Sequence, residues 1–219
     1  MEDNIDEVRV SDFIMSLSNE NDNDILELKK YAKEHNVPII RDDAKDILKL
    51  LLELKKPKRI LEIGTAIAYS TLVMHRALKD VEIITIEDYE ERIKEAEKNI
   101  DRYNMKENVT LVAEDASVYL ENVDKQKIEP FDFIFLDAAK GQYINWIDSL
   151  KNLLNSGGII LADNIFKDGE ILESKFLIKK RDRTIHKRMR EFLHVIAKDE
   201  DFKTYFFNIG DGVSISIKK

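Results

Sequence analysis

Short β-rich runs alternate with amphipathic segments from residue 59 onward, and this alternation restricts the fold more than any other feature of the 219-residue chain. Each run is rich in isoleucine, valine, leucine or phenylalanine, and the segments between the runs have helical apolar spacing. Such alternation predicts right-handed β-α-β units and therefore a parallel sheet covered by helices. The five runs are residues 60–63, 83–86, 109–113, 133–136 and 159–162.

The two ends of the chain have different patterns. Near the N-terminus, three segments with apolar residues three or four apart predict helices. These segments are residues 5–17, 25–32 and 47–54, and the expected helix caps are Asp22, Asn23 and Asp42. Near the C-terminus, a Gly-Asp-Gly turn signal at residues 210–212 separates two strand-like runs, at 204–209 and 213–217. We therefore predict an α/β fold with a doubly wound, mostly parallel seven-stranded sheet, N-terminal helices and a C-terminal antiparallel hairpin.

Composition agrees with one compact domain. The chain is 43% hydrophobic and 36% charged, which suffices for a full core, and it has no cysteine for disulfides or thiolate metal sites. No repeat, low-complexity segment or Pro/Gly-rich linker marks a boundary, so we predict a single domain over residues 1–219, with a helical extension at 1–56 and an α/β core at 57–219. An acidic N-terminus and the lack of a run of roughly 20 apolar residues predict a cytoplasmic protein without a membrane partner.

Oxygen-bearing side chains follow two of the predicted strands. Asp137 comes directly after residues 133–136, and Asp163 with Asn164 follows residues 159–162. Because parallel strands end at the same edge of a sheet, these side chains are expected to lie together as ligands of a divalent cation. Lys140 would lie beside that cation, which would lower the lysine pKa and allow a neutral amine to act as a base. Either acid alone would be an ordinary polar strand end, and the pairing favours a metal site.

The first three strand ends carry residues typical of an adenosyl site. Gly64 lets the backbone approach a ligand closely, Glu87 closes the second strand where an acid can bind ribose hydroxyls, and Asp115 with Ala116 can frame an adenine. A dinucleotide dehydrogenase would require G-x-G-x-x-G after the first strand, whereas this chain supplies only Gly64. The sequence therefore disfavours an NAD(P)-binding oxidoreductase, which is the alternative from another enzyme class.

Three motifs carry a family resemblance. They are EIGTAIAYS at residues 62–70, DAAKGQY at 137–143 and GGIILADN at 157–164. Together they resemble the divalent-metal-dependent class I O-methyltransferases of the catechol and caffeoyl-CoA type, over nearly the whole chain. Within that family the chain is most similar to the bacterial tRNA 5-hydroxyuridine methyltransferases, through HNVPI at 35–39, AAKGQY at 138–143 and a basic stretch near residue 180. Ala68 departs from the pattern, because the family usually has a second glycine there.

The resemblance implies a Rossmann-like core, S-adenosylmethionine as methyl donor, Mg²⁺ or another divalent cation, and a homodimer. The residues implied to bind the donor are Ile40, Glu62, Gly64, Ser70, Glu87, Asp115, Ala116 and Asp137. The implied metal ligands are Asp137, Asp163 and Asn164, and Lys140 is the implied general base. The implied acceptor is 5-hydroxyuridine at the wobble position of the tRNA anticodon loop, which would become 5-methoxyuridine.

A basic segment supports a tRNA partner. Residues 175–190 contain eight lysines and arginines and one acid, although the net charge of the chain is −8. On a helix over residues 182–197 the apolar side chains share one face, and a basic stripe lies on another. The stripe, expected to contact tRNA phosphates, is Lys180, Arg183, Lys187 and Arg190. A solvated helix face is the ordinary alternative, and a small catechol or hydroxycinnamoyl compound is the alternative acceptor. A catalytically inert RNA-binding module is disfavoured by the intact metal ligands and Lys140.

Overall fold

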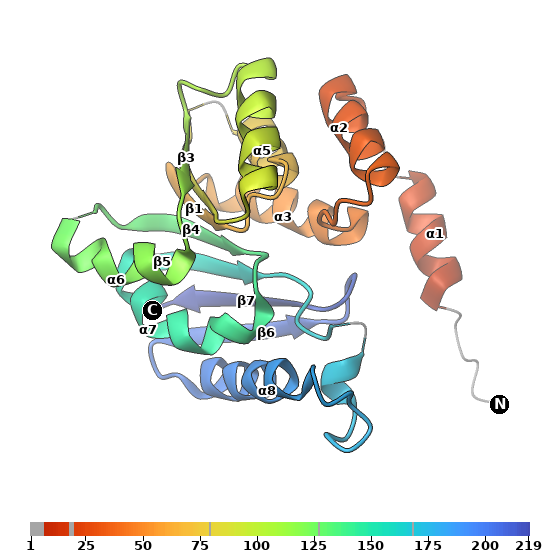
Figure 1. The fold of residues 1–219 in the computed structure, drawn as a ribbon, viewed down its shortest axis with the longest axis vertical. Coiled ribbons are helices and arrows are strands. Elements are labelled where there is room, and N and C mark those ends of the chain that lie inside the picture. Colours follow the sequence, from red (N-terminus) through yellow and green to blue (C-terminus); the bar gives the residue numbers. More distant parts are fainter. Residues whose placement is uncertain (1–6, 18–19, 79, 127, 168) are drawn as a thin grey trace.

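A computed structural model describes residues 7–17, 20–78, 80–126, 128–167 and 169–219. Its centre is a seven-stranded sheet in the order β3-β2-β1-β4-β5-β7-β6 (Figure 1). The first five strands are parallel, and β7 runs antiparallel to both of its neighbours. The strands are β1 (Arg59–Ile63), β2 (Glu82–Glu87), β3 (Val109–Ala113), β4 (Phe131–Leu136), β5 (Leu154–Ala162), β6 (Phe202–Phe207) and β7 (Val213–Lys218). The predicted fold class, including the antiparallel C-terminal hairpin, is confirmed.

Helices cover both faces of the sheet (Figure 1). On β1 and β4 successive side chains point to opposite faces. Ile60 and Phe133 pack in a core with α2, α3, α4 and α5, whereas Leu61 and Ile134 pack in a second core with α6, α7 and α8. The helices are α1 (Glu7–Leu17), α2 (Asn23–Glu34), α3 (Asp42–Lys55), α4 (Tyr69–Ala77), α5 (Glu90–Arg102), α6 (Ala116–Gln126), α7 (Tyr143–Leu153) and α8 (Arg183–Lys198), with short 3₁₀ turns η1 (Lys140–Gln142) and η2 (Glu170–Leu172). No helix in the described ranges is long and apolar enough to cross a membrane.

Two of the three predicted helix caps are wrong. Asp22 caps α2 as expected, since its carboxylate accepts hydrogen bonds from the backbone N–H groups of the first helical turn. Asn23, however, is already part of α2, and the residue that caps α3 is Arg41 instead of Asp42. Asp42 is the first residue of α3, and its carboxylate forms ion pairs with two lysines instead of capping the helix.

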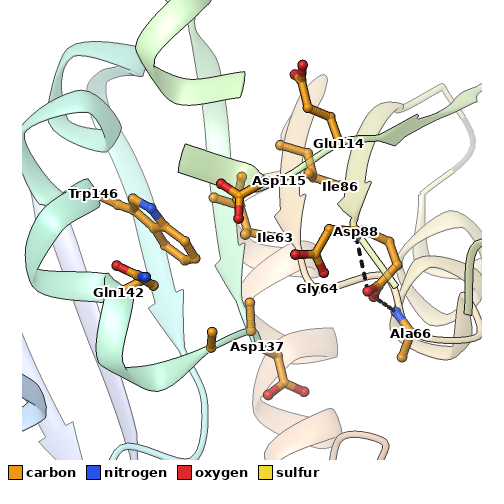
Figure 2. A pocket seen from close by; sticks show the side chains of 14 residues that line it. Ile63, Gly64, Ala66, Ile86, Asp88, Glu114, Asp115, Asp137, Gln142 and Trp146 are labelled. Carbon is orange, nitrogen blue, oxygen red and sulfur yellow. Dashed lines mark hydrogen bonds between the residues drawn. The ribbon is translucent and has the colours of Figure 1, made fainter. Parts of the chain in front are cut away.

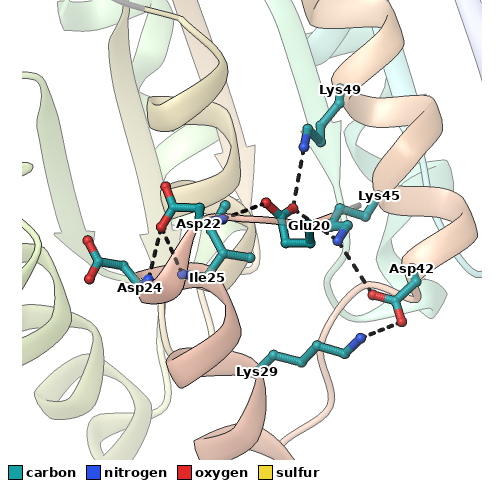
Figure 3. A network of polar contacts seen from close by, with 8 residues as sticks. All are labelled: Glu20, Asp22, Asp24, Ile25, Lys29, Asp42, Lys45 and Lys49. Carbon is teal, nitrogen blue, oxygen red and sulfur yellow. Dashed lines mark hydrogen bonds and ion pairs between the residues drawn. The ribbon is translucent and has the colours of Figure 1, made fainter. Parts of the chain in front are cut away.

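A polar network joins the segment before α2 to α3 (Figure 3). Glu20 accepts hydrogen bonds from Lys45 and Lys49, each at 3.3 Å, and Lys45 is only 2% exposed. Asp42 lies 2.5 Å from Lys29 and 3.6 Å from Lys45. A buried lysine requires such partners because an unpaired buried charge is strongly destabilising. The network therefore fixes the N-terminal helices that cover one face of the sheet.

Candidate functional site

The carboxyl ends of β1 to β5 meet at one edge of the sheet, where the strand order reverses between β1 and β4. Gly64 directly follows β1, Glu87 ends β2, and Asp115 lies just beyond β3. Asp137 and Asp163 directly follow β4 and β5. The structure therefore brings these five predicted site residues to the same edge, and Figure 2 shows several of them around one cavity.

The cavity in Figure 2 has a volume of about 380 Å³ and an acidic wall. Gly64 and Ala116, which the sequence predicts to contact the methyl donor, form part of its lining. Its carboxylates belong to Glu87, Asp88, Glu114, Asp115 and Asp137. Such a wall attracts a positively charged ligand and repels an anionic one.

Two smaller cavities continue from the first. One, of about 110 Å³, is lined by Ile40 and Ser70 and shares Gly64 and Asp137 with the first cavity. The other, of about 280 Å³, is lined by Lys140 and shares Asn164 with the second. The remaining residues of this outer cavity are Arg41, Lys167 and Asp211. A ligand in the first cavity can thus reach the residues predicted to bind metal.

The turn after β1 has little free space. Gly64 has φ +105°, and a Cβ atom added to it would lie 2.2 Å from the Asp137 carbonyl oxygen. The Ala66 backbone N–H donates to a Glu87 carboxylate oxygen at 2.8 Å, which ties this turn to the end of β2 (Figure 2). Ala68 adopts a left-handed conformation, with φ 64°. Glycine adopts a left-handed conformation without strain, which explains why the family that this chain resembles usually has a glycine at this position.

Glu62 lies in β1, two residues before Gly64, and lines none of the three cavities. It is fully buried, and its carboxylate accepts hydrogen bonds from the hydroxyls of Ser70, Thr71 and Thr85. Burial raises the pKa of Glu62 to about 7, although these three hydroxyls oppose the shift. In this arrangement Glu62 positions Ser70, and any direct contact of Glu62 with a cofactor stays a prediction.

The residues after β4 and β5 form one polar cluster. Lys140 Nζ lies 2.8 Å from Asp137 Oδ1 and 3.0 Å from the Asp163 carbonyl oxygen. Asn164 Nδ2 lies 3.4 Å from the same Asp137 oxygen. The other side of Lys140 faces the Tyr143 hydroxyl at 3.4 Å. The predicted base and the three predicted metal ligands are therefore together.

The electrostatics of this cluster differ for the acid and the amine. Burial and repulsion from Asp137 raise the pKa of Asp163 to about 7. Burial alone would lower the pKa of Lys140, but the electrostatic interactions with Tyr143 and Asp137 outweigh it and keep the pKa above its usual value. The lowered lysine pKa expected from the sequence depended on a neighbouring cation, whereas in the structure Lys140 forms an ion pair with Asp137.

An aromatic and an amide residue that complete the first cavity were not predicted from the sequence. Trp146 and Gln142 line it and come from α7 and η1 (Figure 2). The indole N–H of Trp146 donates to Ser117 at 3.1 Å, which connects α7 to α6. A local signal did exist, because the chain has a single tryptophan and it follows Tyr143 at helical spacing.

Comparisons with known proteins identify the family. A family model described as O-methyltransferase matches residues 15–219. The chain belongs to the O-methyltransferase family. A catechol O-methyltransferase from Niastella koreensis is 34% identical over 167 residues, which cover 75% of this chain and 76% of that protein. A flavonoid 3',5'-methyltransferase from Vitis vinifera is 27% identical over 197 residues, covering 87% and 81% of the two chains. The predicted enzyme class is confirmed.

A solved structure supports the same assignment. The O-methyltransferase from Bacillus cereus, determined in complex with SAH, matches this chain with a TM-score of 0.84 and 25% identity. The match covers 96% of this methyltransferase and 97% of the other chain. The strand order and the C-terminal hairpin described above are therefore features of an O-methyltransferase fold.

Three of the four residues of the basic stripe of this methyltransferase line a groove. Arg183, Lys187 and Arg190, together with Lys175, line a cavity of about 720 Å³ between α8 and the preceding segment. Lys180 is exposed but does not line it. Arg183 and Arg190 also donate hydrogen bonds to backbone carbonyls of that segment, at 3.1 and 2.7 Å. Their guanidinium groups therefore stabilise the groove wall, which the sequence pattern did not indicate.

Proposed function

We propose that this O-methyltransferase transfers the methyl group of S-adenosylmethionine to one of two adjacent oxygens of its acceptor. The acidic wall of the first cavity is the observation that carries the choice of donor. S-adenosylmethionine has a cationic sulfonium and an amino group, whereas a nicotinamide dinucleotide would place a pyrophosphate against five carboxylates. The SAH bound to the Bacillus cereus neighbour supports the same choice.

The donor would occupy the first two cavities. In the first, Glu87 would accept hydrogen bonds from the ribose, and Asp115 with Ala116 would border the adenine. In the second, Ser70 and Ile40 would border the methionine end. Gly64 would lie against the donor because it lines both cavities. This placement directs the methyl group toward the polar cluster at the outer cavity.

The polar cluster fits a divalent cation. Asp163 Oδ2 is buried and has no hydrogen-bond partner among the described residues, which is costly for a carboxylate. Within the described ranges no group of three or more His, Cys, Asp or Glu residues is placed to hold a metal ion, so the proposed ligand set is two acids with the Asn164 amide. These are the hard oxygen ligands that Mg²⁺ prefers. A bound cation would hold two vicinal acceptor oxygens and stabilise the oxyanion.

Lys140 is proposed to accept the proton of the acceptor hydroxyl as a neutral amine, a form that a divalent cation bound beside it would favour by lowering the lysine pKa. Its ammonium group is held by Asp137 and by the Asp163 carbonyl, so the amine has a fixed position at the outer cavity. Tyr143 is fully buried beside it and narrows the space that the lysine can occupy. A fixed base contributes to methyl transfer because the attacking oxygen must be deprotonated and aligned with the methyl carbon.

For the acceptor we propose 5-hydroxyuridine in the anticodon loop of tRNA, which would become 5-methoxyuridine. O4 and the 5-hydroxyl of this base form a vicinal pair, and the basic groove beside α8 offers phosphate contacts. A small catechol is the second candidate, favoured by the likeness to the Niastella koreensis protein. The test compares kcat/KM for tRNA bearing 5-hydroxyuridine and for a catechol, with labelled S-adenosylmethionine. A strong preference for the catechol would reject the tRNA proposal.

A homodimer is also proposed. The helix α1 lies at the margin of the molecule (Figure 1) and exposes apolar side chains to solvent. These are Val10, Phe13, Ile14 and Leu17. Covering them with a second copy would remove apolar surface from water. Light scattering on the wild type and on Phe13→Glu tests this, and a monomeric wild type would contradict it.

A further inference from the structure

Beside the basic groove, a short segment exposes large apolar side chains. Leu172, Phe176 and Leu177 are 71%, 76% and 74% exposed. Lys175 lines the groove, and its ammonium lies 5.1 Å from the centroid of the Phe176 ring. Isolated exposed apolar residues are common, but here an exposed ring borders a groove lined by four cationic side chains.

This segment is held in place by side chains of α8. His186 is buried, and its Nε2 lies 3.0 Å from the Glu173 carbonyl oxygen. Arg190 donates to the Ile171 carbonyl and Arg183 to the Ile178 carbonyl. The bonds from α8 therefore fix the backbone on both sides of Phe176, so the ring has a defined support.

The same helix also contacts the loop that carries Lys140. Arg188 NH1 lies 3.4 Å from the carbonyl oxygen of Gly141. On the other side of the segment, Lys167 lines the outer cavity and lies 3.5 Å from Asp182, the cap of α8. Helix α8 thus contacts the groove, the segment that carries Phe176 and the residues around the outer cavity.

We infer that Phe176 is a stacking platform for an unpaired RNA base whose neighbouring phosphates lie in the groove of Lys175, Arg183, Lys187 and Arg190. The inference rests on the proposed tRNA function and adds a residue that recognises an unpaired nucleotide. Aromatic rings next to cations are the usual means of binding unpaired nucleotides, because every base has a face that can stack. The cationic lining of the groove favours a nucleic acid, because each nucleotide carries a phosphate that a lysine or arginine can contact.

The test measures binding of an anticodon stem-loop RNA and of a fully paired hairpin of equal length. Removing one stacked base costs about 1 to 3 kcal/mol, so Phe176→Ala should weaken stem-loop binding by roughly 5- to 150-fold. The salt dependence of binding should stay unchanged, since no charge is removed. Leu177→Ala is the matched control because Leu177 is equally exposed and not aromatic, and it should bind like wild type. Phe176→Trp should retain binding.

Phosphate contacts are tested separately with Lys187→Ala, which should reduce the slope of log affinity against log salt by roughly 0.7 for a single strand. Thermal melting and calorimetry with S-adenosylmethionine verify that each variant is folded. Equal binding by Phe176→Ala and wild type, or equal losses in Leu177→Ala, would overturn the platform while leaving the proposed function in place. A wild-type protein that binds neither RNA would overturn both, and an equal loss on the paired hairpin would show that no base stacks on the ring.

Discussion

Gly64→Ala is expected to damage both stability and function, because Gly64 lies where β1 meets the start of the Asp137 loop. The added Cβ would be 2.2 Å from the Asp137 carbonyl oxygen and 2.7 Å from its carbon. Relief of this contact must move the backbone that positions a proposed metal ligand, and it threatens the 3.0 Å hydrogen bond from Asp137 N–H to the Ile63 carbonyl. The positive φ of +105° adds backbone strain.

The magnitude follows from these two costs. Strained backbone costs about 1 to 3 kcal/mol, and overpacking costs about as much again. We therefore expect a loss of roughly 2 to 6 kcal/mol in the free energy of unfolding. For a chain of this size that lowers Tm by roughly 4 to 24 °C. Calorimetric melting measures the shift, and titration with S-adenosylmethionine should show weakened binding.

Gly169→Ala is the matched control. Gly169 also has positive φ, at +80°, but among the described residues no atom beyond its chain neighbours lies within 4 Å of its added Cβ. It should therefore show the backbone cost alone, about 1 to 3 kcal/mol, with donor affinity unchanged. If Gly64→Ala and Gly169→Ala have the same Tm, and Gly64→Ala binds the donor like wild type, the close approach of the β1 turn to Asp137 does not restrict which residue position 64 can hold.

Three further predictions concern the polar groups. Asp163→Ala should abolish methyl transfer while donor binding survives, and EDTA should inhibit the wild type reversibly. Full turnover in verified metal-free buffer would show that the reaction does not need a divalent cation. Lys140→Ala should lower turnover about 10²-fold or more, with partial rescue at high pH. The control Lys179→Ala should have wild-type turnover. Normal turnover of Lys140→Ala at neutral pH would show that Lys140 is not the general base. Although burial raises the pKa of Glu20, the Asp22 backbone N–H and the ammonium groups of Lys49 and Lys45 lower it overall. Its carboxylate therefore stabilises the fold above the unfolded-state pKa, and this contribution is lost as pH falls through the folded-state pKa. Glu20→Gln should thus unfold more easily than wild type at neutral pH and equally easily in acid below the folded-state pKa of Glu20, and a pH-independent difference in urea unfolding would contradict this pairing.

The sheet and its functional edge were predictable because they follow from local patterns. Parallel strands end on one side, so residues such as Glu87 and Asp137 had to converge once the strands were recognised. The start of β5 at Leu154 was not predictable, since Asn-Ser-Gly-Gly at 155–158 has the composition of a turn although the structure pairs β5 with β4 from Leu154 on. The structure accommodates this stretch with a register shift opposite β4.

Other site features depend on contacts between distant segments. Trp146 reaches the first cavity only because α7 packs next to α6, and no periodicity in the sequence indicates which helix face borders a cavity. The hydrogen bonds of Glu62 to three hydroxyls involve residues from the first turn of α4 and from β2, so its buried position could not be predicted. The Asp42 cap was wrong for a similar reason, because Lys29 on another helix competes for its carboxylate.

Nucleoside mass spectrometry of tRNA from a deletion strain tests the proposed function most directly. Loss of this methyltransferase should remove 5-methoxyuridine and allow 5-hydroxyuridine to accumulate. The wild-type gene should restore the modified nucleoside, and a gene encoding Asp163→Ala should not. Unchanged 5-methoxyuridine in the deletion strain, with no other enzyme able to supply it, would contradict the tRNA acceptor and leave a small vicinal diol as the substrate.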